Sequence, residues 1–153
     1  MGGTRQRWLI LAAIILTVAI AVPSAVGLYW WNLQRKIMSV EWQDAATPAQ
    51  RKDVAERLLW FPWGDPHDAF VTLLEEGDAS SIPSLLAGLR QLPDTPPGGA
   101  MLCTKAHCLK ALRRITGHNA GWNYSDWRKW WDEVGSKLPP SAFPLRESAA
   151  LGS

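Results

Sequence analysis

The sequence is short of several features on which enzymes and nucleic-acid-binding proteins depend. Its 153 residues contain no glycine-rich phosphate loop and no nucleophile elbow. The net charge is only +2, which gives no electrostatic reason to expect nucleic acid as a partner. The chain has two cysteines, Cys103 and Cys108, too few for a disulfide-dense scaffold. Apolar residues never alternate over a useful length, so no strand is predicted and the fold class should be all-α.

Charge is missing altogether from one long stretch near the start of the chain. From Trp8 to Leu33 there is no Asp, Glu, Lys or Arg. As a helix this stretch spans about 39 Å, more than the roughly 30 Å hydrocarbon core of a bilayer. Trp8 stands at one end and Tyr29, Trp30 and Trp31 at the other, where aromatic rings favour the membrane–water interface. We therefore predict a single transmembrane helix over residues 8–33, within a membrane anchor of residues 1–36.

Cleavage of this segment is the competing interpretation. Arg5 and Arg7 precede the apolar run, and Ala25-Val26-Gly27 has the small residues of a signal-peptidase site. Cleavage there would release an exported soluble domain that starts near Leu28. The apolar run continues past the site, however, which favours an uncleaved single-pass anchor.

The orientation of the anchor follows from charge. Two basic residues lie on each side of the apolar run, and the free amino terminus adds a charge to the short side. Because cytoplasmic flanks carry the excess of positive charge, we predict a cytoplasmic N-terminus and a domain on the extracytoplasmic side.

Behind the anchor the sequence predicts a linker at 37–46, a helical domain at 47–138 and a flexible, proline-containing tail at 139–153. Thr47-Pro48-Ala49-Gln50 has the form of a capping box, and Asp65-Pro66 repeats the cap-then-proline order. Gly77 is expected to end a helix in the left-handed conformation. Apolar residues at steps of three and four then predict about five helices, near residues 48–60, 66–76, 79–92, 101–116 and 124–134.

Two stretches of the domain resemble HEAT-type α-helical repeats. The first runs from Leu73 to Leu86, where a helix end is followed by Gly-Asp, Ile-Pro and a leucine stripe. The second is Ala111-Leu112-Arg113-Arg114-Ile115-Thr116-Gly117, followed by the tryptophan-rich segment 127–131. The resemblance covers roughly residues 47–138 and shows about two repeats. It implies a short α-solenoid that binds proteins, and it implies no catalytic residue and no cofactor.

Aromatic residues are the strongest candidates for contacts with a membrane or a partner. The chain has ten tryptophans, and each carries a large apolar surface that is costly to expose. A loop cannot easily bury Trp60, Phe61 and Trp63 together, so a membrane or partner contact competes evenly with local packing there. Trp127, Trp130 and Trp131 lie at core spacing and are expected to pack inside. The candidate contact residues are therefore Trp8, Tyr29, Trp30, Trp31, Trp60, Phe61 and Trp63.

Thiol or metal chemistry is the third hypothesis. Cys103, His107 and Cys108, with His118 further on, offer ligands that zinc accepts. On a helix Cys103 and His107 share a face, whereas Cys108 points about 100° away from His107. We therefore expect no metal site. The default interpretation is that the cysteines are small buried residues and the histidines belong to the polar surface. A disulfide between the two cysteines would require residue 103 to precede the helix.

Acid–base chemistry at His67 and Asp68, beside Asp65, is the remaining possibility. Helix capping accounts for both aspartates and leaves His67 on the surface, so no catalytic residue is predicted. Taken together, the sequence predicts a non-enzymatic, membrane-anchored scaffold or accessory subunit of a larger membrane complex. Its predicted partners are lipid and other membrane-complex proteins, with no nucleic acid and no small-molecule substrate.

Overall fold

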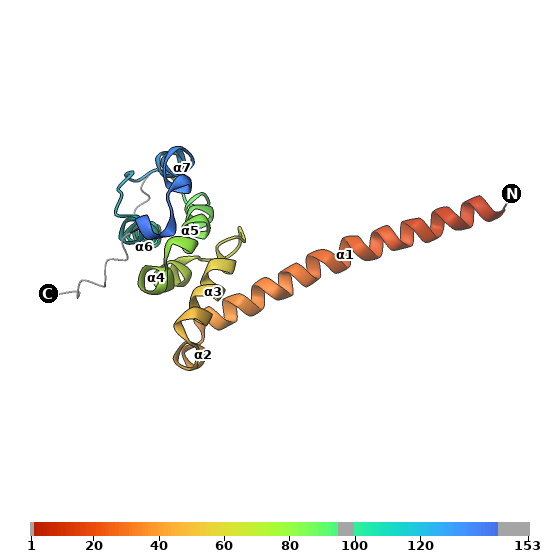
Figure 1. Ribbon diagram of the computed structural model, residues 1–153. Helices are drawn as coiled ribbons and strands as arrows, with labels where there is room; N and C mark the ends of the chain where they lie inside the picture. The colour runs from red at the N-terminus through yellow and green to blue at the C-terminus, as the bar shows by residue number, and fades with distance from the viewer. Residues whose placement is uncertain (1, 95–99, 144–153) are drawn as a thin grey trace.

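The computed structural model describes residues 2–94 and 100–143. Every regular element in these two ranges is helical, which confirms the all-α class. One long helix, α1, projects from a group of shorter helices (Figure 1). The HEAT-like solenoid of about five helices is not established by this arrangement and remains an expectation. Residues 95–99 and the part of the predicted tail from residue 144 onward lie outside the described residues.

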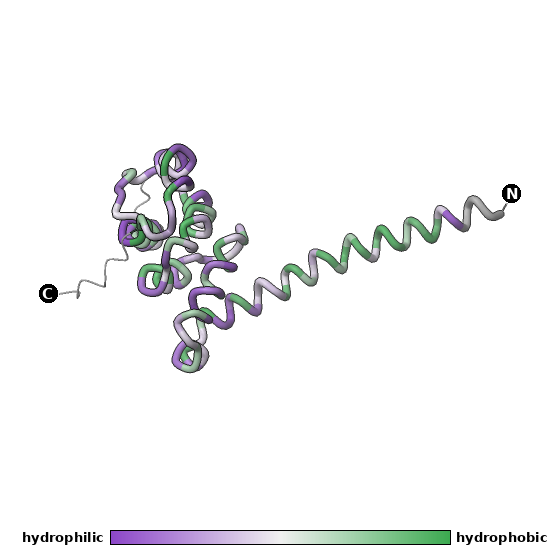
Figure 2. The backbone as a smooth tube through the Cα atoms, viewed as in Figure 1, coloured by the Kyte–Doolittle hydropathy of each residue, from purple (hydrophilic) through white to green (hydrophobic). Residues whose placement is uncertain are grey.

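Helix α1 (Gly2–Met38) runs without a break through Pro23. Its segment Arg7–Met38 is long and apolar enough to cross a membrane, with a mean hydropathy of 2.7 over its most apolar window, and that window is wholly unburied. Figure 2 shows the hydrophobic stretch of α1 extending away from the domain. The hydroxyls of Thr17 and Ser24 donate to the carbonyls of Ala13 and Ile20, so both are satisfied inside the helix, as lipid requires.

The last turns of α1 belong to the domain. Leu33 and Ile37 are buried against α3 (Pro48–Leu58). Residues 37–46, where the sequence indicated a linker, instead contain helix α2 (Val40–Ala45). Ser39 caps α2 through a bond from the Trp42 amide. The sequence missed α2 because a six-residue helix is too short to show periodicity.

Helices α3 and α4 (His67–Glu76) form the next packed pair. The capping box at Thr47 and Gln50 is present as predicted. Val54, Ala55 and Leu58 of α3 are buried with Ala69, Phe70 and Leu73 of α4. At the rim of this pair, Arg51 forms an ion pair with Glu76 and also donates to the carbonyls of Gln43 and Ala46. The polar rim therefore joins α2, α3 and α4.

Gly77 is needed for close packing and does not have the left-handed conformation that we expected. Its φ is −66° and its ψ is 148°. A Cβ at this position would lie 2.4 Å from the Leu73 carbonyl oxygen and 3.2 Å from Ile115 Cδ1. Gly117, in contrast, does end a helix with a positive φ of 67°.

The second half of the domain contains α5 (Ile82–Leu89) and α6 (Ala100–Thr116), preceded by the 3₁₀ turn η1 (Ala79–Ser81). Asp78 caps η1 through the Ser80 amide. Helix α6 packs mainly against α4 and also against α5. Leu109, Leu112 and Ile115 of α6 are buried, so this helix contributes apolar side chains to the core that it shares with α4 and α5.

Helix α7 (Tyr124–Glu133) completes the domain, followed by the 3₁₀ turns η2 (Gly135–Lys137) and η3 (Pro140–Ala142). Trp127 is fully buried, which confirms core packing for this ring, whereas Trp130 and Trp131 are half-buried. The start of the predicted flexible tail is also packed, because Phe143 is buried beside Trp131.

Candidate functional site

The junction between α1 and the domain is lined by four aromatic rings. Tyr29 and Trp30 come from α1, and Phe61 and Trp63 come from the loop between α3 and α4. Ring centroids lie 6.0 Å apart for Tyr29 and Phe61, 6.2 Å for Trp30 and Trp63, and 5.8 Å for Phe61 and Trp63. Such separations suit tilted and edge-on aromatic contacts. We call this group the aromatic collar.

Polar bonds hold the collar in place. Trp30 Nε1 donates to the Trp63 carbonyl at 3.2 Å, and Arg57 Nη1 donates to the Tyr29 hydroxyl at 3.1 Å. Gly64 has a positive φ of 83°, and a Cβ there would lie 2.9 Å from the Trp30 ring. Glycine at 64 therefore provides both the turn and the space that let the loop lie against α1.

The collar lies one bilayer thickness from the first tryptophan of α1. At about 1.5 Å per residue, the stretch from Trp8 to Leu28 covers about 30 Å. If Trp8 marks one interface, the collar marks the other. Trp31 and Trp63 remain about half exposed, at 56% and 49%, so aromatic surface is left uncovered at this end of the stretch.

Of the other predicted contact residues, Trp31 lies beside the collar, with its ring centroid 6.4 Å from that of Trp30, whereas Trp8 and Trp60 lie apart from it. Trp8 is 72% exposed near the far end of α1. Trp60 is 61% exposed, and its Nε1 donates to Ser84 Oγ on α5 at 3.1 Å. The cluster that the sequence suggested at Trp60, Phe61 and Trp63 is therefore divided. Two rings turn toward α1, and one lies on the domain surface.

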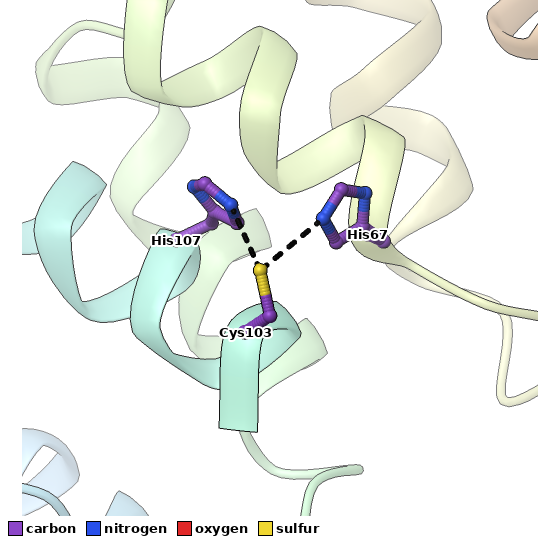
Figure 3. Close-up of side chains that lie close together, drawn as sticks. All are labelled: His67, Cys103 and His107. Carbon is purple, nitrogen blue, oxygen red and sulfur yellow. Dashed lines mark hydrogen bonds between the residues drawn. The ribbon is translucent and has the colours of Figure 1, made fainter. Parts of the chain in front are cut away.

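A second group of reactive side chains gathers where α4 meets the first turns of α6. His67, Cys103 and His107 point toward one another (Figure 3), and their ligand atoms all lie within 4.8 Å. Cys103 Sγ is 3.3 Å from His107 Nε2 and 3.7 Å from His67 Nε2. The two imidazole rings meet edge to face with centroids 5.0 Å apart. We call this group the His–Cys–His cluster.

Electrostatics within the cluster act on His107. Burial lowers the pKa of His107, and the nearby charges of His67 and Lys110 act in the same direction. His67 Nδ1 lies 3.1 Å from Asp68 Oδ1, so this carboxylate can accept a hydrogen bond from His67 in the tautomer that carries its proton on Nδ1. That tautomer directs the lone pair of His67 Nε2 toward the cysteine sulfur.

The other predicted thiol and imidazole residues lie elsewhere. Cys108 is fully buried with its Sγ 3.5 Å from the Leu85 carbonyl oxygen, and burial raises the pKa of its thiol. Both cysteines are free. His118 stacks on Trp130 with ring centroids 4.6 Å apart. The expected angular divergence of Cys108 is thus confirmed, and the structure places His67 where sequence reasoning had considered Cys108.

His67 is the residue that sequence reasoning overlooked as a neighbour of Cys103. It lies at the start of a different helix, 36 positions away in the chain. The one available signal was the shared face of Cys103 and His107, which left room for a third ligand from another element.

Comparison with known proteins adds no relative to this description. The sequence matches no protein-family model, no curated protein and no solved structure.

Proposed function

We propose that this protein is a single-pass membrane protein whose helical domain acts as a non-enzymatic scaffold or accessory subunit, docking on other proteins of a membrane complex. One observation carries the proposal. Helix α1 is apolar and unburied over its membrane-length window, yet its last turns are part of the domain core. The domain would therefore be coupled rigidly to an anchor.

Exposed apolar area argues for lipid around α1. The large apolar side chains from Trp8 to Leu28 that stand exposed include Ile15 at 67% and Leu28 at 70%. Each costs roughly 1.5–3 kcal/mol when left in water instead of being buried. Neither the domain nor any other described element covers them, and a bilayer would.

The collar supports a fixed orientation on the membrane. Trp30 is bonded to the α3–α4 loop, so the loop and the end of α1 would enter the interface together. An anchored domain searches for partners in two dimensions, which raises its effective concentration near other membrane proteins. This favours a scaffold or accessory role with modest intrinsic affinity.

Two measurements on native membranes test the proposal. Carbonate washing should leave the full-length protein in the pellet, and solubilisation in mild detergent should recover it with a stoichiometric partner. A chain that washes off with carbonate, or that elutes as a monomer without a partner, would contradict it. Mass spectrometry of the mature N-terminus tests the exported alternative, since cleavage near Leu28 would leave the collar intact on a released domain.

The side of the membrane is tested separately. A cysteine placed near the N-terminus and one placed in the domain can be labelled from one side of sealed vesicles with an impermeant reagent. The proposed topology requires the domain to label from the extracytoplasmic face.

A further inference from the structure

We propose that His67, Cys103 and His107 form a binding site for a zinc ion that keeps one coordination position open. This inference does not depend on the proposed scaffold function. It arises because the fold brings together ligands from two helices that the sequence keeps far apart.

The distances in the His–Cys–His cluster fit tetrahedral zinc. With zinc–sulfur bonds of about 2.3 Å and zinc–nitrogen bonds of about 2.05 Å, tetrahedral angles place a sulfur and a nitrogen ligand about 3.6 Å apart. Cys103 Sγ lies 3.3 Å from one imidazole nitrogen and 3.7 Å from the other. Tetrahedral zinc places its two nitrogen ligands about 3.3 Å apart, so binding would require the imidazole nitrogens to approach each other from a separation of at most 4.8 Å.

The backbone holds these ligands in position. Cys103 and His107 are one turn apart on α6, so they share a face. His67 is the first residue of α4, and its amide donates to Asp65 Oδ1 at 2.9 Å. The two helices pack along their length through the domain core. The cluster therefore needs no unwinding of α6, which a site built from Cys103 and Cys108 would have required.

Asp68 is suited to act as an outer-shell partner. Histidines that bind metals usually donate their second ring proton to a carboxylate or carbonyl, which fixes the ring and raises its basicity. Asp68 Oδ1 is 3.1 Å from His67 Nδ1, in the position for this role. His107 Nδ1 is buried and has no hydrogen-bond partner among the described residues. The carboxylate thus supports one of the two imidazoles.

The ligand set and its exposure indicate a site with three protein ligands. Cys103 is exposed, and His67 and His107 are half-buried, so an ion can enter from solvent. Structural zinc sites normally have four protein ligands, whereas three leave a position for water or another exchangeable ligand. One thiolate and two neutral imidazoles would leave the site with a charge of about +1, attractive to an anionic or neutral oxygen ligand.

Metal titration of the full-length protein in detergent tests the site. The protein is purified with a chelator, dialysed, and titrated with zinc against a competing indicator; cobalt then reports thiolate ligation through its absorption spectrum. We expect one zinc per chain. His67→Gln and Cys103→Ser should each weaken binding by more than about 100-fold, because losing a ligand exceeds the roughly 10–100-fold cost of losing an outer-shell partner.

Matched variants separate a built site from general thiol or imidazole binding. Cys108→Ala and His118→Gln remove the same residue types outside the cluster and should leave zinc affinity unchanged. Asp68→Asn should weaken it by about 10–100-fold. Circular dichroism confirms that each variant is folded before titration. Three results would overturn the proposal. Zinc binding could survive Cys103→Ser, it could be lost in Cys108→Ala, or the protein could bind copper and no zinc. None of these results bears on carbonate extraction, so failure of the zinc site and failure of the anchor remain distinguishable.

Discussion

Helix α1 and the domain use the same apolar side chains in opposite surroundings. Leu16 of α1 is 62% exposed, whereas Leu85 of α5 is fully buried. Helices α3, α4, α6 and α7 have charged and polar residues between their apolar positions and therefore have one polar and one apolar face, whereas α5 has no charged residue and is buried over most of its length. In α1 no charged residue occurs from Trp8 to Leu33, so this part of the helix is apolar on every face. The difference teaches that length matters: the eight uncharged residues of α5 fit inside the domain, whereas the uncharged run from Trp8 to Leu33 is too long for the domain to cover and is left exposed.

The sharpest test of this contrast makes the same substitution in both regions. Leu85→Ala should lower the free energy of unfolding of the domain by about 2–5 kcal/mol, because it leaves a cavity in a packed core. Leu16→Ala removes the same atoms where no protein side chain packs, and should change domain stability by less than about 0.5 kcal/mol. Urea unfolding in detergent, followed by tryptophan fluorescence, compares the two. Equal losses would mean that α1 packs on the domain.

Glycine offers a second matched pair with a smaller effect. At Gly88 of α5 a Cβ would lie 2.7 Å from Phe70 Cζ and 2.9 Å from Leu59 Cδ2. Gly88→Ala should therefore destabilise the domain by about 1–3 kcal/mol through overpacking. At Gly27 of α1 nothing lies within 4 Å, so Gly27→Ala should leave the domain transition in place. Thermal melts of both variants decide the comparison, and a destabilised Gly27→Ala protein would contradict it.

The smallest expected effect is that of acid, which should lower the stability of the domain and leave α1 unaffected. Burial by itself raises the pKa of Asp78, but bonds from Lys52 Nζ and from Ser80 hold it below its usual value. A carboxylate with a lowered folded pKa stabilises the fold above its unfolded pKa of about 4, and this stability is lost as the pH falls through the folded value. Asp78→Asn should thus cost less than about 1 kcal/mol at pH 7, because the Asp78 side chain is 44% exposed.

The pH profile supplies the control for that variant. The stability difference between the wild type and Asp78→Asn should shrink below pH 4, as measured by urea unfolding at several pH values. Membrane association should not change over the same range, since the stretch from Trp8 to Leu33 has no acidic or basic side chain to titrate. A constant difference down to pH 2 would show that the ion pair with Lys52 contributes nothing.

Local signals predicted the helices well and the junctions poorly. Thr47 and Gln50 form the expected capping box, and Gly117 ends α6 with a positive φ. These features depend on a few neighbouring residues, so they can be read directly. Gly77 was expected to act as a similar cap, but its backbone is extended and a side chain there would meet Leu73 and also Ile115, which lies on another helix. Contacts of that kind leave no local pattern.

The candidate contact surfaces show the same limit. The aromatic content of both segments was evident, but only the packed structure shows that Phe61 and Trp63 meet Tyr29 and Trp30 while Trp60 turns to α5. His67 likewise joins Cys103 across 36 positions. Periodicity describes which face of a helix a residue occupies, and it does not say which other helix that face will meet.

The amino-acid order alone therefore determined the all-α class and the apolar, membrane-length helix at the start of the chain, because both follow from the spacing of apolar and charged side chains along one segment. Only the tertiary structure decided that α1 ends inside the domain core, that two loop aromatic rings pack against two rings of α1, and that two imidazoles converge on one thiol. Those outcomes depend on how separate helices pack together, a relation that no single segment contains.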